Sequence, residues 1–314
     1  MGRQASRRLP NLIRISNGIT LEGQCGRLRR RSLGTDSVYF HIGLHKTATT
    51  WLQRHLFPSL PGVNCLVTRR IAGITQPQGD APTLIVSHEA LSGTLSSEKQ
   101  PGDNKKRLTE TLSSIAEVAP GAPIIIGFRE HRSWLTAAYA QKAKKQGVKV
   151  ERYLATFSRD DLSWCRSLDL IEDGKRPVFP FLYEELSYAP QALIGDLCRF
   201  LKTEAPTNLS EVLSVRENAS PRSQAGQLLS RPFFQVSYAL EKFTPIKARP
   251  LRELGARLGT RFDQSFAPLQ IDLDHDMARE LRKDWMTLLR RMSDIRGRDL
   301  SVLADKPKVD QVPA

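Results

Sequence analysis

The chain has few cysteines, and they are widely separated. Cys25, Cys65, Cys165 and Cys198 are the only four among 314 residues, and no two of them form a C-x-x-C pair. Secreted disulfide scaffolds are dense in cysteine, and structural zinc sites use closely spaced cysteine and histidine ligands. We therefore expect neither a disulfide framework nor a zinc site, and a reducing compartment suits the chain best.

Long hydrophobic runs are also missing. A membrane-spanning helix needs about 20 consecutive apolar residues, and no stretch of the chain approaches that length. The Arg-rich beginning lacks the apolar segment that a secretory signal peptide carries. We expect a chain without a transmembrane segment and with a cytoplasmic location.

Acidic residues are in deficit. The chain has 47 Lys and Arg against 33 Asp and Glu, a formal net charge of +14. This excess favours anionic partners such as nucleotides, nucleic acids or acidic glycans, without choosing among them. Residues 1–36 carry eight Arg against Glu22 and Asp36. We interpret 1–36 as a disordered basic arm, with weak contact to an acidic lipid surface or nucleic acid as the alternative to a solvated tail.

Residues 37–303 have the pattern of a single α/β domain, and 304–314 that of a disordered tail. Short runs of β-branched and aromatic residues alternate with amphipathic segments, which is typical of a mainly parallel sheet between two layers of helices. A helix is expected from Asp103 or Asn104 to Val118, capped by one of those two side chains. The expected strands are 38–42, 64–68, 83–86, 123–128 and 178–182.

The stretch Ser37–Gln53 predicts a strand, an anion-binding loop and a helix. The strand ends at Gly43, and hydrophobic residues resume at helical spacing after the loop. A loop in this position directs main-chain N–H groups and a helix N-terminus at whatever lies above the strand end, which favours an anion. Lys46 adds a positive charge, and three threonines add hydroxyl donors. The alternative is a glycine and a lysine that merely precede an amphipathic helix.

Two further strand ends carry polar groups. Strand 83–86 leads into the triplet Ser87–Glu89, and strand 123–128 delivers Arg129. Ligands of open α/β sheets bind beyond the carboxyl ends of the strands, so reacting groups are expected there. The alternatives are structural, with Ser87 and Glu89 capping a turn and Arg129 in a surface ion pair.

The first loop resembles the 5′-phosphosulfate loop of sulfotransferases that use 3′-phosphoadenosine-5′-phosphosulfate (PAPS), whose pattern is close to G-x-x-K-[TS]-G-T-[TS]-x-L. A nucleoside-triphosphatase loop has a second Gly directly before its Lys, and this chain has none there. Ala48 stands where the family has Gly, so we expect the loop to form without a residue that adopts positive φ freely. The matching residues are Gly43, Lys46, Thr47, Thr49, Thr50 and Leu52.

The segment after the fourth strand is similar to the family's 3′-phosphate element, R-x-x-x-x-x-x-x-S-x-Y. Arg129 and Tyr139 match it, but Ala137 replaces the Ser. Ser133, one helical turn earlier, and Thr136 are the candidates to supply the missing hydroxyl. Because an Arg is a charged donor and a Ser offers one neutral bond, we expect the site to tolerate the loss.

Two later segments extend the resemblance. Tyr183–Leu186 is similar to a Y-E-[DE]-L turn common in the family, and we interpret Glu184 and Glu185 as turn and helix-capping residues rather than as a catalytic pair. The polar loop 216–223 lies where the family closes its nucleotide site, which makes Arg222 a candidate ligand.

The resemblance implies a P-loop-like sulfotransferase fold and transfer of a sulfuryl group from PAPS to a hydroxyl or amine, such as that of a glycan or glycolipid, with no metal required. Lys46 would neutralise charge on the departing phosphate. Glu89 and His88 compete as the base, and Glu89 is preferred because partial burial raises a carboxylate's pKa toward the useful range. The residues expected to hold PAPS are Gly43, His45, Lys46, Thr47, Ala48, Thr49, Thr50, Arg129, Ser133, Thr136 and Arg222.

Two other functions fit parts of the pattern. A kinase or other P-loop phosphotransferase would use Glu89 as a ligand of Mg²⁺, although the Walker-type G-K-[ST] is absent. A nucleic-acid-binding protein would explain the net charge, although the sequence carries no helix-turn-helix, zinc or RNA-recognition signature.

Overall fold

The computed structural model describes residues 38–71, 74, 83–95, 102–215, 224–243, 248–262 and 269–304. The predicted arm (1–36), Arg222 and all but the first residue of the predicted tail (304–314) lie outside the described residues.

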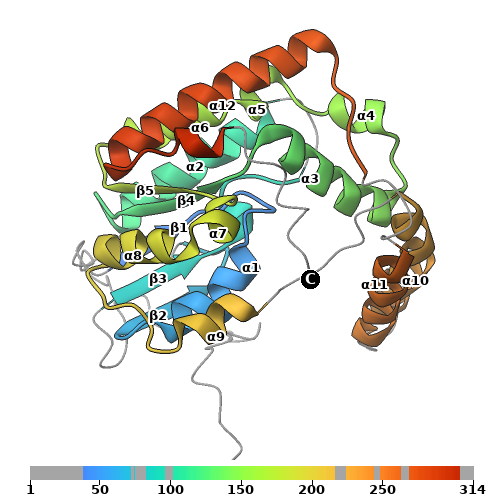
Figure 1. Cartoon of the computed structure of the whole chain (residues 1–314), viewed down its shortest axis with the longest axis horizontal. Helices are drawn as coiled ribbons and strands as arrows, with labels where there is room; N and C mark the ends of the chain where they lie inside the picture. The colour runs from blue at the N-terminus through green and yellow to red at the C-terminus, as the bar shows by residue number, and fades with distance from the viewer. Residues whose placement is uncertain are drawn as a thin grey trace, which may run out of the picture.

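A five-stranded, all-parallel sheet forms the centre of the fold, with the strand order β2-β3-β1-β4-β5 (Figure 1). In the register of its inner strands, Tyr39 lies opposite Ile85, and Phe40 lies opposite Ile124. The prediction of a mainly parallel sheet is confirmed, and each expected strand is found within one residue at either end. The strands are β1 (Val38–His41), β2 (Val63–Val67), β3 (Thr83–Ser87), β4 (Ile124–Phe128) and β5 (Val178–Leu182).

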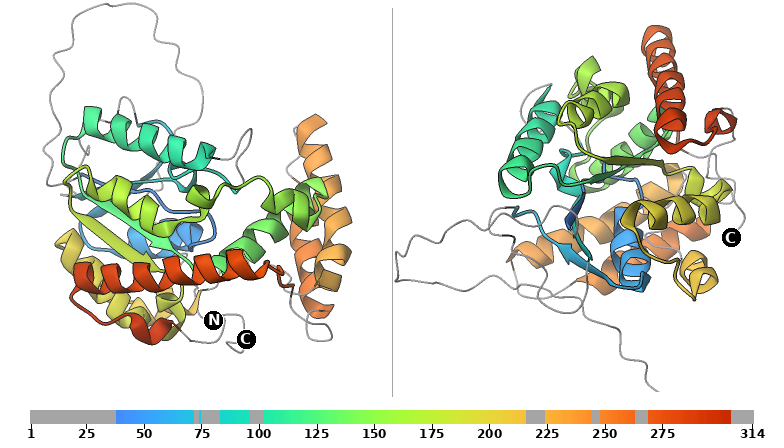
Figure 2. Two further views of the ribbon diagram at one scale, coloured as in Figure 1. Left: turned by 90° about the horizontal axis from the view of Figure 1, so that it is seen from above. Right: turned by 90° about the vertical axis from the view of Figure 1, so that its left-hand side faces the viewer.

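Helices cover both faces of the sheet, as the two side views show (Figure 2). Successive side chains of a strand point to opposite faces, so Phe40 and Val86 belong to one core, and Tyr39 and Ile85 to the other. The middle strands are buried along their whole length, which is why they are near-continuous hydrophobic runs. On the Phe40 face lie α2 (Asp103–Val118), α3 (His131–Gln146), α6 (Trp164–Glu172) and α12 (His275–Arg296); on the Tyr39 face lie α1 (Thr49–Trp51), η2 (Leu52–Leu56), η3 (Phe57–Ser59), α8 (Pro190–Leu201) and α9 (Leu209–Ser214).

The remaining elements are short connections and one helix pair. The pair α10 (Gln224–Phe243) and α11 (Arg249–Phe262) lies at one side of the sheet domain, where α10 contacts α3 (Figures 1 and 2). The short elements are η4 (Glu89–Leu91), α4 (Val150–Leu154), α5 (Arg159–Leu162), α7 (Glu185–Tyr188) and η6 (Ser301–Leu303).

The cap of α2 differs from the predicted one, and α3 has a cap that was not predicted. The cap of α2 is Gly102, with φ 94°, and not Asp103 or Asn104. Asn104 is instead drawn inward, where its Oδ1 accepts from the main-chain N–H of Thr94 at 2.9 Å. The helix α3 begins after Glu130, whose two carboxylate oxygens accept from the N–H groups of its first turn. Glu130 thereby fixes how the chain turns directly after Arg129.

Candidate functional site

The strand order creates a switch point at the carboxyl ends of β1 and β4. The chain leaves β1 toward β2 on one side of the sheet, and it leaves β4 toward β5 on the other. In open α/β sheets the crevice between two such strands is the usual ligand site. The loop with Lys46 follows β1 and Arg129 follows β4, so both predicted phosphate elements meet at this point.

Internal hydrogen bonds hold the Lys46 loop. Ser92 Oγ donates to the carbonyl of Gly43 at 2.8 Å, and Thr47 Oγ1 donates to the carbonyl of Leu44 at 2.6 Å. The hydroxyl proton of Thr47 is therefore used in folding the loop. A Cβ added at Gly43 would lie 2.5 Å from Thr49 Oγ1, so the close approach of strand end and helix start requires glycine. Among the described residues, that buried Thr49 hydroxyl has no hydrogen-bond partner.

Two residues of the loop adopt left-handed backbone conformations. Lys46 has φ 68° and Ala48 has φ 64°, while Thr47 between them does not have positive φ. The loop forms without a glycine at this point, as expected, and Ala48 itself adopts positive φ despite its Cβ. A left-handed conformation costs an L-residue about 1–2 kcal/mol. Alternation of left- and right-handed residues turns successive main-chain N–H groups to one side, a form that binds anions.

Arg129 is buried and held from several directions. Its Nε donates to Ser133 Oγ at 2.8 Å, its Nη1 donates to the carbonyl of Lys46 at 3.4 Å, and its guanidinium lies 4.3 Å from the centre of the Tyr183 ring. The Trp164 indole donates to its carbonyl at 2.9 Å. The guanidinium is thus preorganised at the sheet edge.

The hydroxyl expected beside Arg129 comes from Ser133. Ser133 Oγ accepts from Nε of Arg129, so of the two candidate hydroxyls it is the one that lies beside the guanidinium. Thr136 is directed elsewhere, because its Oγ1 accepts from the N–H of Ile271 at 3.4 Å. Tyr139 donates to the carbonyl of Val148 at 3.2 Å and packs against the core.

Glu184 has a different role from the capping role that was expected. Its side chain makes no cap to α7 and instead accepts from the N–H of Glu130 at 3.0 Å. Burial raises the pKa of Glu184 to about 7, against the opposing effects of that N–H and of Arg129. Glu185 is structural, because it accepts from the N–H of Leu182 and pairs with Arg296. The sequence did not predict that a carboxyl group beside Arg129 ionises near pH 7.

The end of β3 has a buried polar network that the sequence did not indicate. Ser87 Oγ lies 2.7 Å from Nδ1 of His41 and accepts from Gln53 Nε2 at 2.9 Å. Burial lowers the pKa of His41 to about 3, so this imidazole is neutral. The network ties β1, β3 and η2 together beneath the Lys46 loop, and it uses Ser87 for positioning rather than for capping a turn.

His88 caps the turn that follows β3. Its backbone remains extended, and its Nδ1 accepts from the N–H of Ala90 at 2.9 Å. Its Nε2 lies 3.1 Å from Arg69 Nε. Burial lowers the pKa of His88, with the charge of Arg69 as the next cause. The imidazole is therefore engaged at both ring nitrogens.

Glu89 faces the Lys46 loop through a contact that the sequence did not predict. Its Oε2 lies 3.4 Å from Nδ1 of His45. The hydrogen bond from His45 is the largest influence on the pKa of Glu89 and lowers it; burial opposes this, and the charge of Lys46 adds to the lowering. The expectation of a raised pKa at Glu89 is wrong, because the loop surrounds this carboxylate with donors and positive charge.

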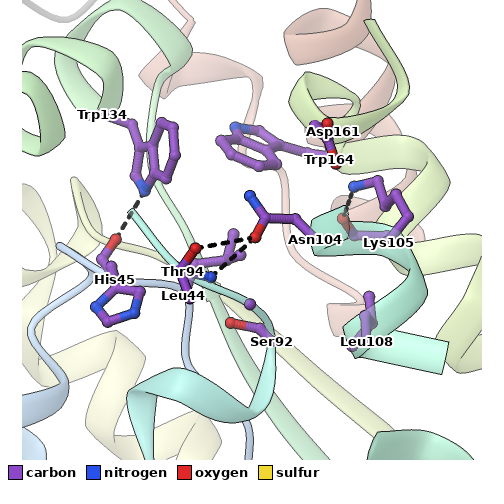
Figure 3. A pocket seen from close by; sticks show the side chains of 12 residues that line it. Leu44, His45, Ser92, Thr94, Asn104, Lys105, Leu108, Trp134, Asp161 and Trp164 are labelled. Carbon is purple, nitrogen blue, oxygen red and sulfur yellow. Dashed lines mark hydrogen bonds between the residues drawn. The ribbon is translucent and has the colours of Figure 1, made fainter. Parts of the chain in front are cut away.

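A small cavity adjoins the same loop (Figure 3). Leu44, His45 and two facing tryptophans line it, and the Trp134 indole donates to the carbonyl of His45 at 2.7 Å. On its far wall, Lys105 donates to the carbonyl of Ser163 at 2.8 Å, and burial lowers the pKa of this lysine to about 8. Neither indole was singled out from the sequence. The full lining is Leu44, His45, Ser92, Gly93, Thr94, Asn104, Lys105, Leu108, Trp134, Asp161, Trp164 and Ser167.

No group of three or more His, Cys, Asp or Glu within the described residues is placed to hold a metal ion. None of the helices in these ranges is long and apolar enough to cross a membrane.

Comparison with known proteins adds no family. No protein-family model matches the chain. No curated protein matches it either.

Proposed function

We propose that the chain is a PAPS-dependent sulfotransferase with a P-loop-like sulfotransferase fold. One observation carries the proposal: the contact between Arg129 and the Lys46 carbonyl, which joins two phosphate-type elements at the switch point of the sheet. Each element alone is a short motif, and short motifs recur by chance. Their meeting at the one crevice where α/β sheets bind nucleotides is the stronger argument.

The loop after β1 suits the 5′-phosphate. Its left-handed residues Lys46 and Ala48 create the main-chain geometry of an anion site. The Thr49 hydroxyl, buried and without a partner among the described residues, is a donor that a phosphate oxygen would satisfy. Thr50 follows it at the start of the helix and offers a second hydroxyl.

Arg129 suits the 3′-phosphate. Its guanidinium is fixed by Ser133 and by the ring of Tyr183, so little side-chain entropy is lost when an anion binds. An arginine fixed in this way recognises phosphate by charge and by paired donors. Thr136 is withdrawn from this assignment because of its bond to Ile271.

The reaction that follows is sulfuryl transfer to a hydroxyl or amine. PAPS, when bound, supplies a sulfuryl group activated by its anhydride bond to the 5′-phosphate. Lys46 neutralises the charge that develops on that phosphate as the bond to sulfur breaks. The proton of the acceptor is taken by a group at the point where the Glu89 carboxylate, after β3, meets the His45 imidazole of the loop after β1.

Two tryptophans close one side of the site. Trp134 and Trp164 face the cavity beside His45. Both indoles are almost fully buried, so they enclose this side of the loop rather than offer a surface to a sugar ring. The proposal of a glycan or glycolipid acceptor therefore rests on the basic character of the chain, which favours an acidic partner.

A thermal-shift measurement separates this proposal from its rivals. The full chain is heated with adenosine 3′,5′-bisphosphate, with ATP and Mg²⁺, or with a short DNA duplex. The proposal expects stabilisation by the bisphosphate, about 2.7 kcal/mol at a hundredfold excess over Kd. Stabilisation by ATP and Mg²⁺ alone would favour a kinase, and stabilisation by the duplex alone a nucleic-acid-binding protein. Lys283→Ala, on the exposed face of α12, is the control for Lys46→Ala in the same assay.

A further inference from the structure

His45 occupies a fixed place on the Lys46 loop. Its carbonyl accepts from the Trp134 indole at 2.7 Å, and its Nδ1 lies 3.4 Å from Oε2 of Glu89. The side chain of His45 is 13% exposed, whereas that of Glu89 is 41% exposed. The imidazole therefore lies closer to the enclosed part of the site than the carboxylate does.

The contact with Glu89 determines which nitrogen of His45 carries the proton. An ionised carboxylate only accepts hydrogen bonds, so Nδ1 of His45 must be the donor. The lowered pKa of Glu89 agrees with an ionised carboxylate. In a neutral imidazole the lone pair then lies on Nε2. Among the described residues, Nε2 of His45 has no hydrogen-bond partner.

The other two candidates for the base are less suited. Nδ1 of His88 already accepts from Ala90, and its other nitrogen lies against Arg69. Glu89 is surrounded by His45, Lys46 and His88, all of which favour its ionised form. A carboxylate stabilised in this way holds a proton weakly, which makes it a better orienting group than a base.

The titratable and charged groups that face His45 come from two elements. Lys46 is its neighbour on the loop, and Glu89 and His88 lie at the start of η4. Trp134, on α3, contributes a neutral indole. Glu89 is the only acid among these groups, so it stabilises an imidazolium at residue 45 against the charge of Lys46.

We propose that His45, oriented by Glu89, is the general base of this site. The inference rests on the proposed sulfotransferase function. As the acceptor oxygen forms its bond to sulfur, its proton passes to Nε2 of His45. The bond between sulfur and the bridging oxygen breaks, and its electron pair stays on the 5′-phosphate beside Lys46. Glu89 keeps Nδ1 protonated and balances the imidazolium, a carboxylate–histidine arrangement that acyl-transfer enzymes also use.

The test measures single-turnover release of sulfate from bound PAPS, with water as the acceptor, in the full chain. Affinity for adenosine 3′,5′-bisphosphate is measured separately by calorimetry. His45→Ala is expected to slow the chemical step by about 10²–10⁴-fold, the usual contribution of a general base. Its affinity for the bisphosphate should stay within about threefold of the wild-type value, because a general base acts on the proton of the acceptor. Free imidazole should restore part of the rate. His275→Gln, at an exposed position of α12, is the matched control.

His45→Asn separates a base from a structural contact. The Asn amide can donate to Glu89 much as Nδ1 does, but it cannot accept a proton. If His45 is the base, His45→Asn is as slow as His45→Ala and binds the bisphosphate normally. A rate restored by Asn would make the contact structural, and a loss of rate in His88→Asn with His45→Ala unchanged would make His88 the base; either result overturns the inference. A wild-type chain that neither binds the bisphosphate nor releases sulfate would refute the proposed function itself.

Discussion

The guanidinium of Arg129 donates to the main-chain carbonyl of Lys46, with Nη1 and the oxygen 3.4 Å apart. These residues are 83 positions apart in the chain and lie at the ends of adjacent parallel strands. Because one contact joins them, a ligand that binds the loop after β1 is also within the field of the arginine. We therefore expect an anion bound at one element to change the affinity of the other element for a second anion.

Lys46→Ala is expected to abolish most of the chemistry while preserving the fold. Loss of a group that stabilises developing charge costs about a hundredfold or more in rate. The measurement is sulfate release from PAPS in single turnover, with circular dichroism to check folding. Lys283→Ala should retain the wild-type rate. An unchanged rate in folded Lys46→Ala would remove this lysine from the mechanism.

Ala48→Gly is expected to stabilise the protein. Ala48 has φ 64°, and relief of the left-handed conformation is worth about 1–2 kcal/mol, less about 0.4–1 kcal/mol for the greater freedom of glycine in the unfolded chain. The net gain in the free energy of unfolding is about 0.5–1 kcal/mol by the same two principles. Urea denaturation measures it.

The control for that change is Ala278→Gly within α12, where a glycine should destabilise by about 1 kcal/mol. If the two substitutions destabilise equally, the backbone at Ala48 carries no strain.

Glu184→Gln is expected to change how stability depends on pH. The pKa of Glu184 rises from 4.5 to about 7 in the folded protein, so the folded state binds the extra proton between these values. The stabilisation is fully present below about pH 4.5 and is lost as the pH rises through about 7, a change of up to about 3 kcal/mol. Glutamine cannot ionise, so the stability of Glu184→Gln should lack this dependence on pH. Above pH 7 the variant should therefore gain stability relative to the wild type.

Urea denaturation at pH 5, 6, 7 and 8 measures the slope. The exposed Glu204→Gln is the matched control. Identical slopes in the wild type and in Glu184→Gln would show that Glu184 is not buried as a neutral acid.

The parallel sheet was predictable because its signals are local. A buried apolar run such as Pro123–Phe128 marks a central strand wherever it occurs. The substitution of Ser133 for Ala137 beside Arg129 was likewise open to prediction, since the two positions share one face of a helix. The strand order, in contrast, depends on contacts between distant segments and could not be inferred from any single stretch.

The errors at the site come from side-chain direction. An extended chain would point His88 and Glu89 to opposite sides, but the chain turns into η4, so His88 caps that turn and Glu89 reaches His45. The same turn explains why the pKa of Glu89 is lowered and not raised, because donors on the loop outweigh burial. Glu184 was assigned to a local cap when its partner, the N–H of Glu130, lies on another strand end. Local patterns contain no information about such partners.

The most direct test of the central claim compares two ligands and three proteins. Calorimetry measures the Kd of adenosine 3′,5′-bisphosphate and of adenosine 5′-phosphate with the wild type and with Arg129→Ala, and Arg290→Ala, on the exposed face of α12, is the control. A charged hydrogen bond is worth about 1.5–3 kcal/mol, so the wild type should prefer the bisphosphate by about 10- to 150-fold. The account predicts that Arg129→Ala loses this preference and keeps its affinity for the 5′-phosphate. A preference that survives in Arg129→Ala, or a wild type that does not distinguish the two ligands, would contradict it.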